Sequence, residues 1–156
     1  MKKKLYIGCA LTKLPLDKET DFLQMIAKIK IGLKETFEIV EFLGVTGLAN
    51  DASPLEVYDW DIKQCVLKAD CMLAICDYPS LGLGYEIATA VEKQGIPVLA
   101  MAYKDTLVSK LIRGVDHKNF QFHYYDSTED IIEKTLESST SKCNTSSKIE
   151  VCNTSI

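Results

Sequence analysis

Short apolar segments of strand length alternate with longer amphipathic segments along most of the chain, and this alternation restricts the fold more than any other feature of the sequence. Two of the apolar segments, KLYIGCAL and CMLAIC, are nearly continuous, which is typical of strands buried on both faces of a parallel sheet. We expect strands at residues 4–11, 38–44, 71–76, 96–102 and 119–125. The sequence therefore predicts a single-domain, doubly wound α/β fold (Rossmann- or flavodoxin-like), with a five-stranded parallel sheet and helices on both faces.

The segments between the predicted strands have the period of amphipathic helices. In residues 19–36, the apolar positions at helical spacing are Phe22, Met25, Ile26, Ile29 and Leu33. The next helix, residues 53–69, starts with a serine cap and a proline. Further helices are expected after the PSLGLGYE turn as far as Glu92, at 106–113 and at 127–138. Ligands of such sheets bind beyond the carboxyl ends of the strands, so we expect a site at that edge.

The composition changes at Ser138, where the remaining residues become rich in serine and threonine and nearly repeat the sequence CNTS. Because they lack apolar periodicity, residues 138–156 are expected to be disordered, and residues 1–137 to form the folded domain. Two glycosylation sequons of this tail, at Asn144 and Asn153, are expected to be chance matches, since no secretory signal is recognised.

Composition and charge argue against several classes of function. Of the 156 residues 47% are hydrophobic, and the net charge is −4, so we expect binding neither to nucleic acid nor to an anionic membrane. No apolar segment approaches the roughly 20 residues of a membrane span. The six cysteines contain no C-x-x-C pair, and neither His117 nor His123 has a ligand partner nearby. We therefore expect a cytoplasmic protein without a metal site, a disulfide framework or a redox cofactor.

Two of the predicted strand ends should open onto one rim of the sheet. The candidate ligand-binding residues at this rim are Gly8, Ala10 and Thr12 after the first strand, and Ser80, Gly82 and Gly84 after the third. Glycines let the backbone approach a ligand closely. The Gly-x-Gly sequence lacks the third glycine of a dinucleotide-binding fingerprint and does not follow the first strand, so we do not expect an NAD site.

Glu86 follows this glycine turn, on what the sequence predicts to be the first turn of a helix. At that position the helix dipole favours an ionised carboxylate. An ionised carboxylate beside a ligand suits nucleophilic attack, or stabilisation of positive charge, at the anomeric carbon of a sugar. The alternative interpretation is a solvated glutamate that only complements the dipole.

A second carboxylate is needed to protonate or steer a leaving group, and the helix at 53–69 offers Asp59 and Asp61. The apolar stripe of this helix comprises Leu55, Tyr58, Ile62, Cys65, Val66 and Ala69. At about 100° per residue, the two aspartates lie on opposite sides of the stripe, so helical geometry does not choose between them. Trp60, between the two, is expected to pack the helix, although it could reach a base.

The pairing of VYDWDIKQCVLKAD with PSLGLGYEIATAVE resembles the nucleoside 2-deoxyribosyltransferase superfamily. The likeness is greatest to the nucleotide N-glycosidase branch that includes 2′-deoxynucleoside 5′-phosphate N-hydrolase, and it runs from Leu5 to about Asp126. It implies that Glu86 is the nucleophile, that Asp61 assists the leaving base or the sugar, and that Tyr6 contacts the nucleophile.

Ser80 and Ser109 link the chain to the nucleotide hydrolases. Transferases that act on free nucleosides resemble one another in having an aspartate six positions before the nucleophile, where this chain has Ser80. In the hydrolases this serine helps to hold the 5′-phosphate. Ser109, in VSKLIRG, matches a serine that reaches the phosphate from a neighbouring subunit, which implies a homodimer with shared sites. The first loop, CALTK, departs from the family's glycine-serine and arginine, and Thr12 or Lys13 could replace those donors.

The resemblance implies cleavage of the base–sugar bond of a nucleoside 5′-monophosphate or deoxynucleoside through a covalent glycosyl-Glu86 intermediate, without a cofactor. Three alternatives stay open: base exchange by a 2-deoxyribosyltransferase, nucleotide binding without cleavage, and a purely structural α/β domain. The base and sugar preference does not follow from the sequence.

Overall fold

The computed structural model describes residues 1–11, 14–41 and 51–140. Its centre is a five-stranded sheet in the order β2-β1-β3-β4-β5, in which all neighbouring strands are parallel. The strands are β1 (Lys3–Cys9), β2 (Phe37–Val40), β3 (Cys71–Ile75), β4 (Val98–Tyr103) and β5 (Phe120–Tyr125). This is the flavodoxin-like order of a doubly wound sheet, so the predicted fold class is confirmed.

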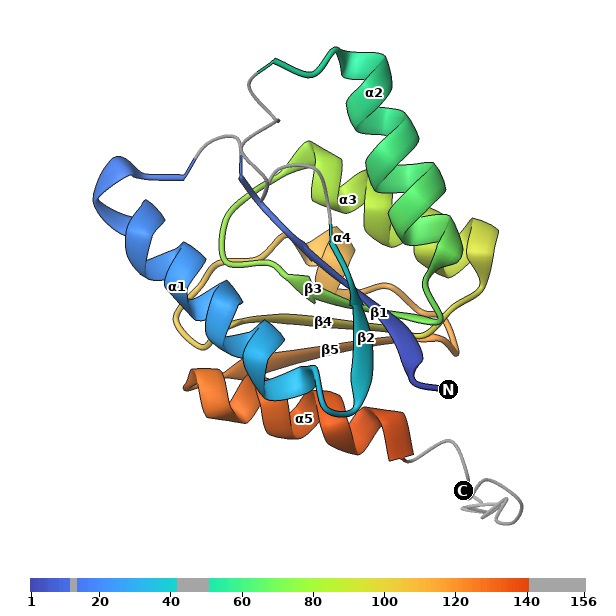
Figure 1. The fold of residues 1–156 in the computed structure, drawn as a ribbon. Helices are drawn as coiled ribbons and strands as arrows, with labels where there is room; N and C mark the ends of the chain where they lie inside the picture. Colours follow the sequence, from blue (N-terminus) through green and yellow to red (C-terminus); the bar gives the residue numbers. More distant parts are fainter. Residues whose placement is uncertain (12–13, 42–50, 141–156) are drawn as a thin grey trace, which may run out of the picture.

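Helices cover both faces of the sheet (Figure 1). One face is covered by α1 (Leu16–Leu33) and α5 (Thr128–Thr140). The other face is covered by a helical segment made of α2 (Pro54–Tyr58), η3 (Asp59–Cys65) and η4 (Val66–Lys68), and by α3 (Leu81–Ala88) with its continuation η5 (Thr89–Gln94). The short helix α4 (Lys110–Arg113) precedes β5. We refer to these as the α1/α5 face and the α2/α3 face.

Each strand sends alternate side chains to the two faces, and each face has its own hydrophobic core. In β1, Leu5 and Ile7 enter the core under α1 and α5, whereas Tyr6 enters the core under α2 and α3. Tyr6 and the helix α3 therefore meet on the same side of the sheet.

Several predicted boundaries differ from the structure. The second strand begins at Phe37 and ends at Val40, and predicted strand residues 42–44 lie outside the described part of the chain. The helix predicted at 106–113 begins only at Lys110, because the Ser109 side chain caps it by accepting a hydrogen bond from the Leu111 N–H. The closing helix, predicted at 127–138, spans Thr128–Thr140. Residues 141–156 of the predicted tail lie outside the described residues.

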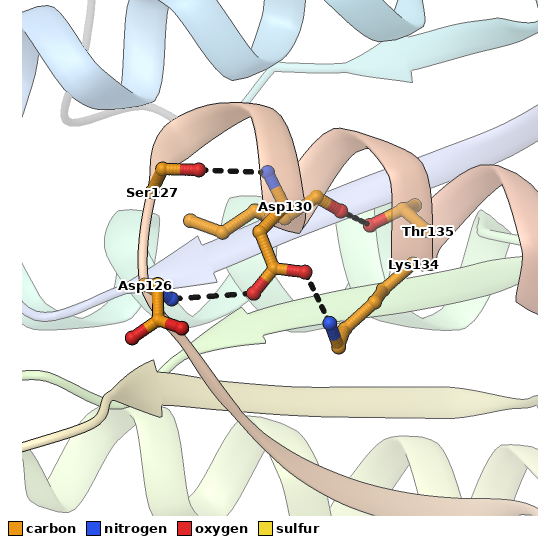
Figure 2. A network of polar contacts seen from close by, with 6 residues as sticks. Asp126, Ser127, Asp130, Lys134 and Thr135 are labelled. Carbon is orange, nitrogen blue, oxygen red and sulfur yellow. Dashed lines mark hydrogen bonds and ion pairs between the residues drawn. The ribbon is translucent and has the colours of Figure 1, made fainter.

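The start of α5 is held by a local polar network (Figure 2). The Ser127 hydroxyl accepts a hydrogen bond from the Asp130 N–H at 3.2 Å, and the Asp130 carboxylate accepts one from the Asp126 N–H at 3.2 Å. Asp130 also forms an ion pair with Lys134 one turn later. The network satisfies amide groups that the start of a helix leaves unpaired. These residues therefore have a structural role, and their arrangement requires no ligand.

Within residues 1–11, 14–41 and 51–140, no helix is both long and apolar enough to cross a membrane. The same residues contain no group of three or more histidine, cysteine, aspartate or glutamate side chains that could hold a metal ion.

Candidate active site

Tyr6 and Glu86 meet at the centre of the candidate site. The Tyr6 side chain is only 2% exposed, and its hydroxyl donates a hydrogen bond to the Glu86 carboxylate. The contact joins the middle of β1 to α3, two elements that are far apart in the sequence. The predicted contact between this tyrosine and the candidate nucleophile is therefore present in the structure.

Gly8 provides the surface against which the Glu86 carboxylate lies. A Cβ atom built on Gly8 would be 2.9 Å from Glu86 Oε2, 2.8 Å from Met72 Cε and 3.0 Å from Leu83 Cδ1. The side chain of any other residue would therefore displace the carboxylate or its apolar neighbours. Oε2 itself is buried and has no hydrogen-bond partner among the described residues. Gly8, predicted as a substrate-binding residue, is thus in contact with the candidate nucleophile.

The predicted position of Glu86 on the first turn of its helix is wrong. α3 begins at Leu81, because Ser80 is its N-cap and its side-chain oxygen accepts a hydrogen bond from the Leu83 N–H at 3.2 Å. Gly82 and Gly84 therefore lie inside the helix rather than in a preceding turn. Glu86 falls on the second turn, where the effect of the helix dipole is weaker.

The protonation state predicted for Glu86 is also reversed in the free protein. Burial, and next the negative charge of Asp61, raise the pKa of Glu86 to about 8, although the hydrogen bond from Tyr6 acts in the opposite direction. Glu86 therefore holds a proton near neutral pH. Neither the burial nor the approach of Asp61 is visible in the local sequence.

The structure separates the two candidate second carboxylates. Asp61 acts electrostatically on both Glu86 and Tyr6, whereas Asp59 forms an ion pair with Lys63 at 2.5 Å and has a side chain that is 46% exposed. We call Tyr6, Asp61 and Glu86 the carboxylate cluster. Of the two aspartates, Asp61 is the one that belongs to it.

The chain is not α-helical around the two aspartates, so the angles of a regular α-helical wheel do not apply there. Residues 59–65 form a π-helix, and the Val66 N–H donates to the carbonyl groups of both Asp61 and Ile62. A π-helix has more residues per turn than the α-helix assumed in the prediction. Leu55 and Tyr58, which were expected in the apolar stripe, lie in the preceding α-helix α2 and are exposed, whereas the other stripe residues are buried as predicted: Ile62, Cys65, Val66 and Ala69.

The remaining predicted binding residues differ in their exposure and in their contacts. A Cβ atom on Gly84 would meet nothing within 4 Å, and one on Gly82 would meet only Ser80 Oγ at 3.7 Å, so both leave open space for a ligand. Ala10 is buried. Ser109 is exposed, and none of its described contacts is with the carboxylate cluster.

Thr12 and Lys13, the candidate phosphate donors, lie outside the described residues. Cys65, expected only as a small hydrophobe, lies beside the carboxylate cluster, and its pKa is raised to about 12 by burial and by the charges of Asp61 and Glu86. No sequence signal distinguishes it from the other cysteines in apolar segments.

Two curated proteins are similar to this chain in sequence. One, named "Putative 2'-deoxynucleoside 5'-phosphate N-hydrolase 1" and from Thermofilum pendens, is 40% identical over 84 residues, which cover 53% of this chain and 57% of that protein. A protein of the same name from Methanococcoides burtonii is 33% identical over 70 residues, covering 45% of this chain and 56% of that protein. The chain thus spans little more than half the length of these relatives. No protein-family model matches it.

Solved structures with the same fold include the CMP N-glycosidase BcmB of Clostridium botulinum, with a TM-score of 0.66 and 19% identity over 87% of this chain and 99% of that one. A conserved protein from Enterococcus faecalis V583 has a TM-score of 0.60 and 17% identity, over 88% of this chain and 99% of that one. Because the sequence identities are below 20%, these two structures are evidence for the fold alone. They confirm the predicted fold. The curated relatives confirm the resemblance to the nucleotide N-hydrolases that the sequence predicted.

Proposed function

We propose that the chain is an N-glycosidase that hydrolyses the base–sugar bond of a nucleoside 5′-monophosphate or a deoxynucleoside. The observation that carries the proposal is the carboxylate cluster, in which burial and next the charge of Asp61 raise the pKa of Glu86 and Tyr6 hydrogen-bonds to Glu86. Glycoside hydrolysis needs two carboxyl groups in different protonation states, and a pair of interacting acids that retains one proton supplies them. The two similar proteins are named as N-hydrolases, and these names support the same reaction class.

The first step uses the proton that the cluster holds. When substrate binds, the proton of Glu86 passes to Asp61, which leaves Glu86 ionised and Asp61 protonated. Glu86 attacks C1′, the C1′–N bond breaks, and its electron pair leaves with the base, which takes the proton from Asp61. The product of this step is a glycosyl ester on Glu86 together with a neutral base, while Tyr6 holds the Glu86 carboxylate in line.

Water completes the reaction. The hydroxyl group of the water adds to C1′, and the ester bond to Glu86 breaks. The remaining proton of the water molecule returns to the cluster. The sugar or sugar phosphate is released, and the cluster again holds one proton. If another base reaches the glycosyl ester before water, the same chemistry yields base exchange, which is the transferase alternative.

Ser80 is our candidate for 5′-phosphate recognition within the subunit. Its oxygen caps α3, so its hydroxyl proton can be donated to a phosphate oxygen. Ser109 is the candidate from a second subunit, since it is exposed and makes no described contact with the carboxylate cluster of its own chain. Homodimerisation, Thr12 as a phosphate contact, Ala10 as a substrate contact and a cytoplasmic location stay predictions.

Replacing Asp61 by asparagine is expected to lower kcat/KM for base release by roughly 100- to 1,000-fold, because the leaving base loses its proton donor. Asp59→Asn is the matched control on the same helical segment, and we expect it to stay within about twofold of the parent, since its carboxylate faces Lys63. Release of free base is measured by chromatography with dCMP, dGMP, CMP and deoxycytidine, with and without an added acceptor base. Equal losses in both variants would contradict the assignment of Asp61.

The activity is expected to fall as the pH rises above about 8. The active cluster contains one proton, and the pKa of Glu86 near 8 marks the loss of that proton when Asp61 is already ionised. Above this pH both carboxylates are charged and the leaving base has no acid, so kcat/KM should drop about tenfold per pH unit. A profile of kcat/KM between pH 5 and 10 tests this, and a rate that keeps rising through pH 8 would exclude the shared proton.

Tight binding of a nucleotide without any base release, in the parent protein and across the substrate panel, would instead favour the non-catalytic alternative. Isothermal titration calorimetry on the same set of nucleotides separates the two outcomes.

A further inference from the structure

The backbone carbonyl of Glu41 accepts two hydrogen bonds from the helical segment that carries Asp61. The Trp60 indole Nε1–H donates to it at 3.1 Å, and the Cys65 thiol donates to it at 3.4 Å. Glu41 follows the last residue of β2, and its carboxylate forms an ion pair with Lys30 of α1. The carbonyl is thus attached to the sheet and to the opposite helix layer.

The two donors bracket one of the two π-helical segments among the described residues, the other being η5. Trp60 and Cys65 lie near the two ends of the π-helix Asp59–Cys65, and Asp61 lies between them. π-helical turns are rare and occur frequently at functional sites. A change of this segment toward α-helical geometry would turn Asp61 relative to Glu86, because the two helix types differ in residues per turn.

We propose that Trp60 and Cys65 are positioning residues, which hold the π-helical segment on the Glu41 carbonyl so that Asp61 stays within electrostatic reach of Glu86. This inference rests on the proposed function. It assigns the indole a structural contact with the protein, so the Trp60 N–H is not available to hydrogen-bond a base.

The chemistry of the two donors agrees with this role. The Trp60 side chain is 44% exposed, so its ring contributes less to the core than a buried tryptophan would, and its hydrogen bond is the specific contact that it adds. Cys65 is fully buried, and the rise of its pKa to about 12 keeps the thiol protonated and able to donate. Cys65 also acts electrostatically on Tyr6, so the thiol lies close to the carboxylate cluster.

The first test replaces Trp60 by phenylalanine, which keeps an aromatic ring and removes the N–H donor. We expect kcat to fall about tenfold or more with little change in KM, since a small misplacement of a catalytic group is sufficient for such a loss. The descending limb of the pH profile should move to lower pH, because a displaced Asp61 no longer raises the pKa of Glu86. Tyr58→Phe is the matched control, since Tyr58 is 38% exposed, lies on the same segment and has no described bond to Glu41.

Cys65 gives a second, independent test. Cys65→Ser keeps a donor and is expected to retain most of the activity, whereas Cys65→Ala removes the donor and should show the same loss of kcat and the same pH shift as Trp60→Phe. Equal activity of the alanine and serine variants would overturn the role of the thiol.

A double-mutant cycle between Trp60→Phe and Asp61→Asn decides whether Trp60 acts through Asp61. If it does, the tryptophan substitution causes no further loss in the Asp61→Asn background. Additive losses, or a loss confined to KM, would overturn the inference and indicate that Trp60 contacts the substrate. An inactive Asp61→Asn variant with an unaffected Trp60→Phe variant would also overturn it while leaving the proposed function intact. Full activity of Asp61→Asn would instead overturn the proposed function and this inference with it.

Discussion

Glu86→Gln is expected to abolish base release and, at pH 8, to make the protein more stable. Activity should fall by roughly 1,000-fold or more, because an amide cannot attack C1′. The folded state should become more stable, because glutamine does not place an ionised group beside Asp61. Glutamine also keeps the side-chain volume and can still accept the hydrogen bond from Tyr6. We expect an increase in the free energy of unfolding of about 1–3 kcal/mol at pH 8.

The pH dependence of this stabilisation follows from the pKa of Glu86. In the unfolded chain the carboxyl group loses its proton near pH 4.5, whereas in the folded protein it does so at about 8. Between these values the folded state binds more protons than the unfolded state, so the contribution of Glu86 to stability decreases as the pH rises through this window. The difference in stability between Glu86→Gln and the parent should therefore be small near pH 5 and largest at pH 8 and above.

Urea denaturation at pH 5, 6.5 and 8, followed by circular dichroism, measures this difference, and the base-release assay is run on the same preparations. Glu92→Gln is the matched control, because Glu92 is exposed on the continuation of the same helix. We expect it to change neither activity nor the pH dependence of stability. A Glu86→Gln variant that is inactive but less stable than the parent at every pH would contradict a buried Glu86 carboxyl group with a raised pKa.

The sequence was sufficient to predict the fold because the relevant information is local and repeated. Continuous apolar segments such as CMLAIC correspond to buried strands, and the alternation along β1 places Tyr6 opposite Leu5 and Ile7. With the strand ends at one edge, the meeting of β1 and α3 follows from topology. This part of the candidate site was therefore accessible without coordinates.

The details of the site depend on contacts that no local pattern encodes. The π-helical turn around Asp61 has no recognised sequence signature, so the angles of a regular α-helical wheel do not apply to it. The start of α3 did have a signal, since Ser80 precedes Leu83 at capping distance, but the glycine pair was interpreted as a turn. The pKa of Glu86 is set by burial and by a charge from another helical segment, which only the tertiary structure reveals.

Gly8→Ala is expected to inactivate the protein while reducing its stability only moderately. The three atoms that a Cβ would meet at 2.8–3.0 Å are all side-chain ends, so the strand can stay in place while Met72, Leu83 and Glu86 move. Moving buried side chains to admit one methyl group costs about 1–3 kcal/mol. Displacing the Glu86 carboxylate is more serious for the reaction, since a shift of about 1 Å in a reacting group can lower the rate by 100-fold.

Gly32→Ala is the control that separates crowding from catalysis. Its Cβ would lie 2.5 Å from Ile132 Cδ1, a closer contact than any at Gly8, but at the packing of α1 against α5 on the opposite face of the sheet. We expect this variant to keep kcat/KM within about twofold, whatever its change in stability. Both variants are compared by urea denaturation and by base release at pH 7. If Gly8→Ala is as active as the parent, the Glu86 carboxylate does not have to lie against the backbone of β1, and the geometry assigned to the nucleophile is wrong.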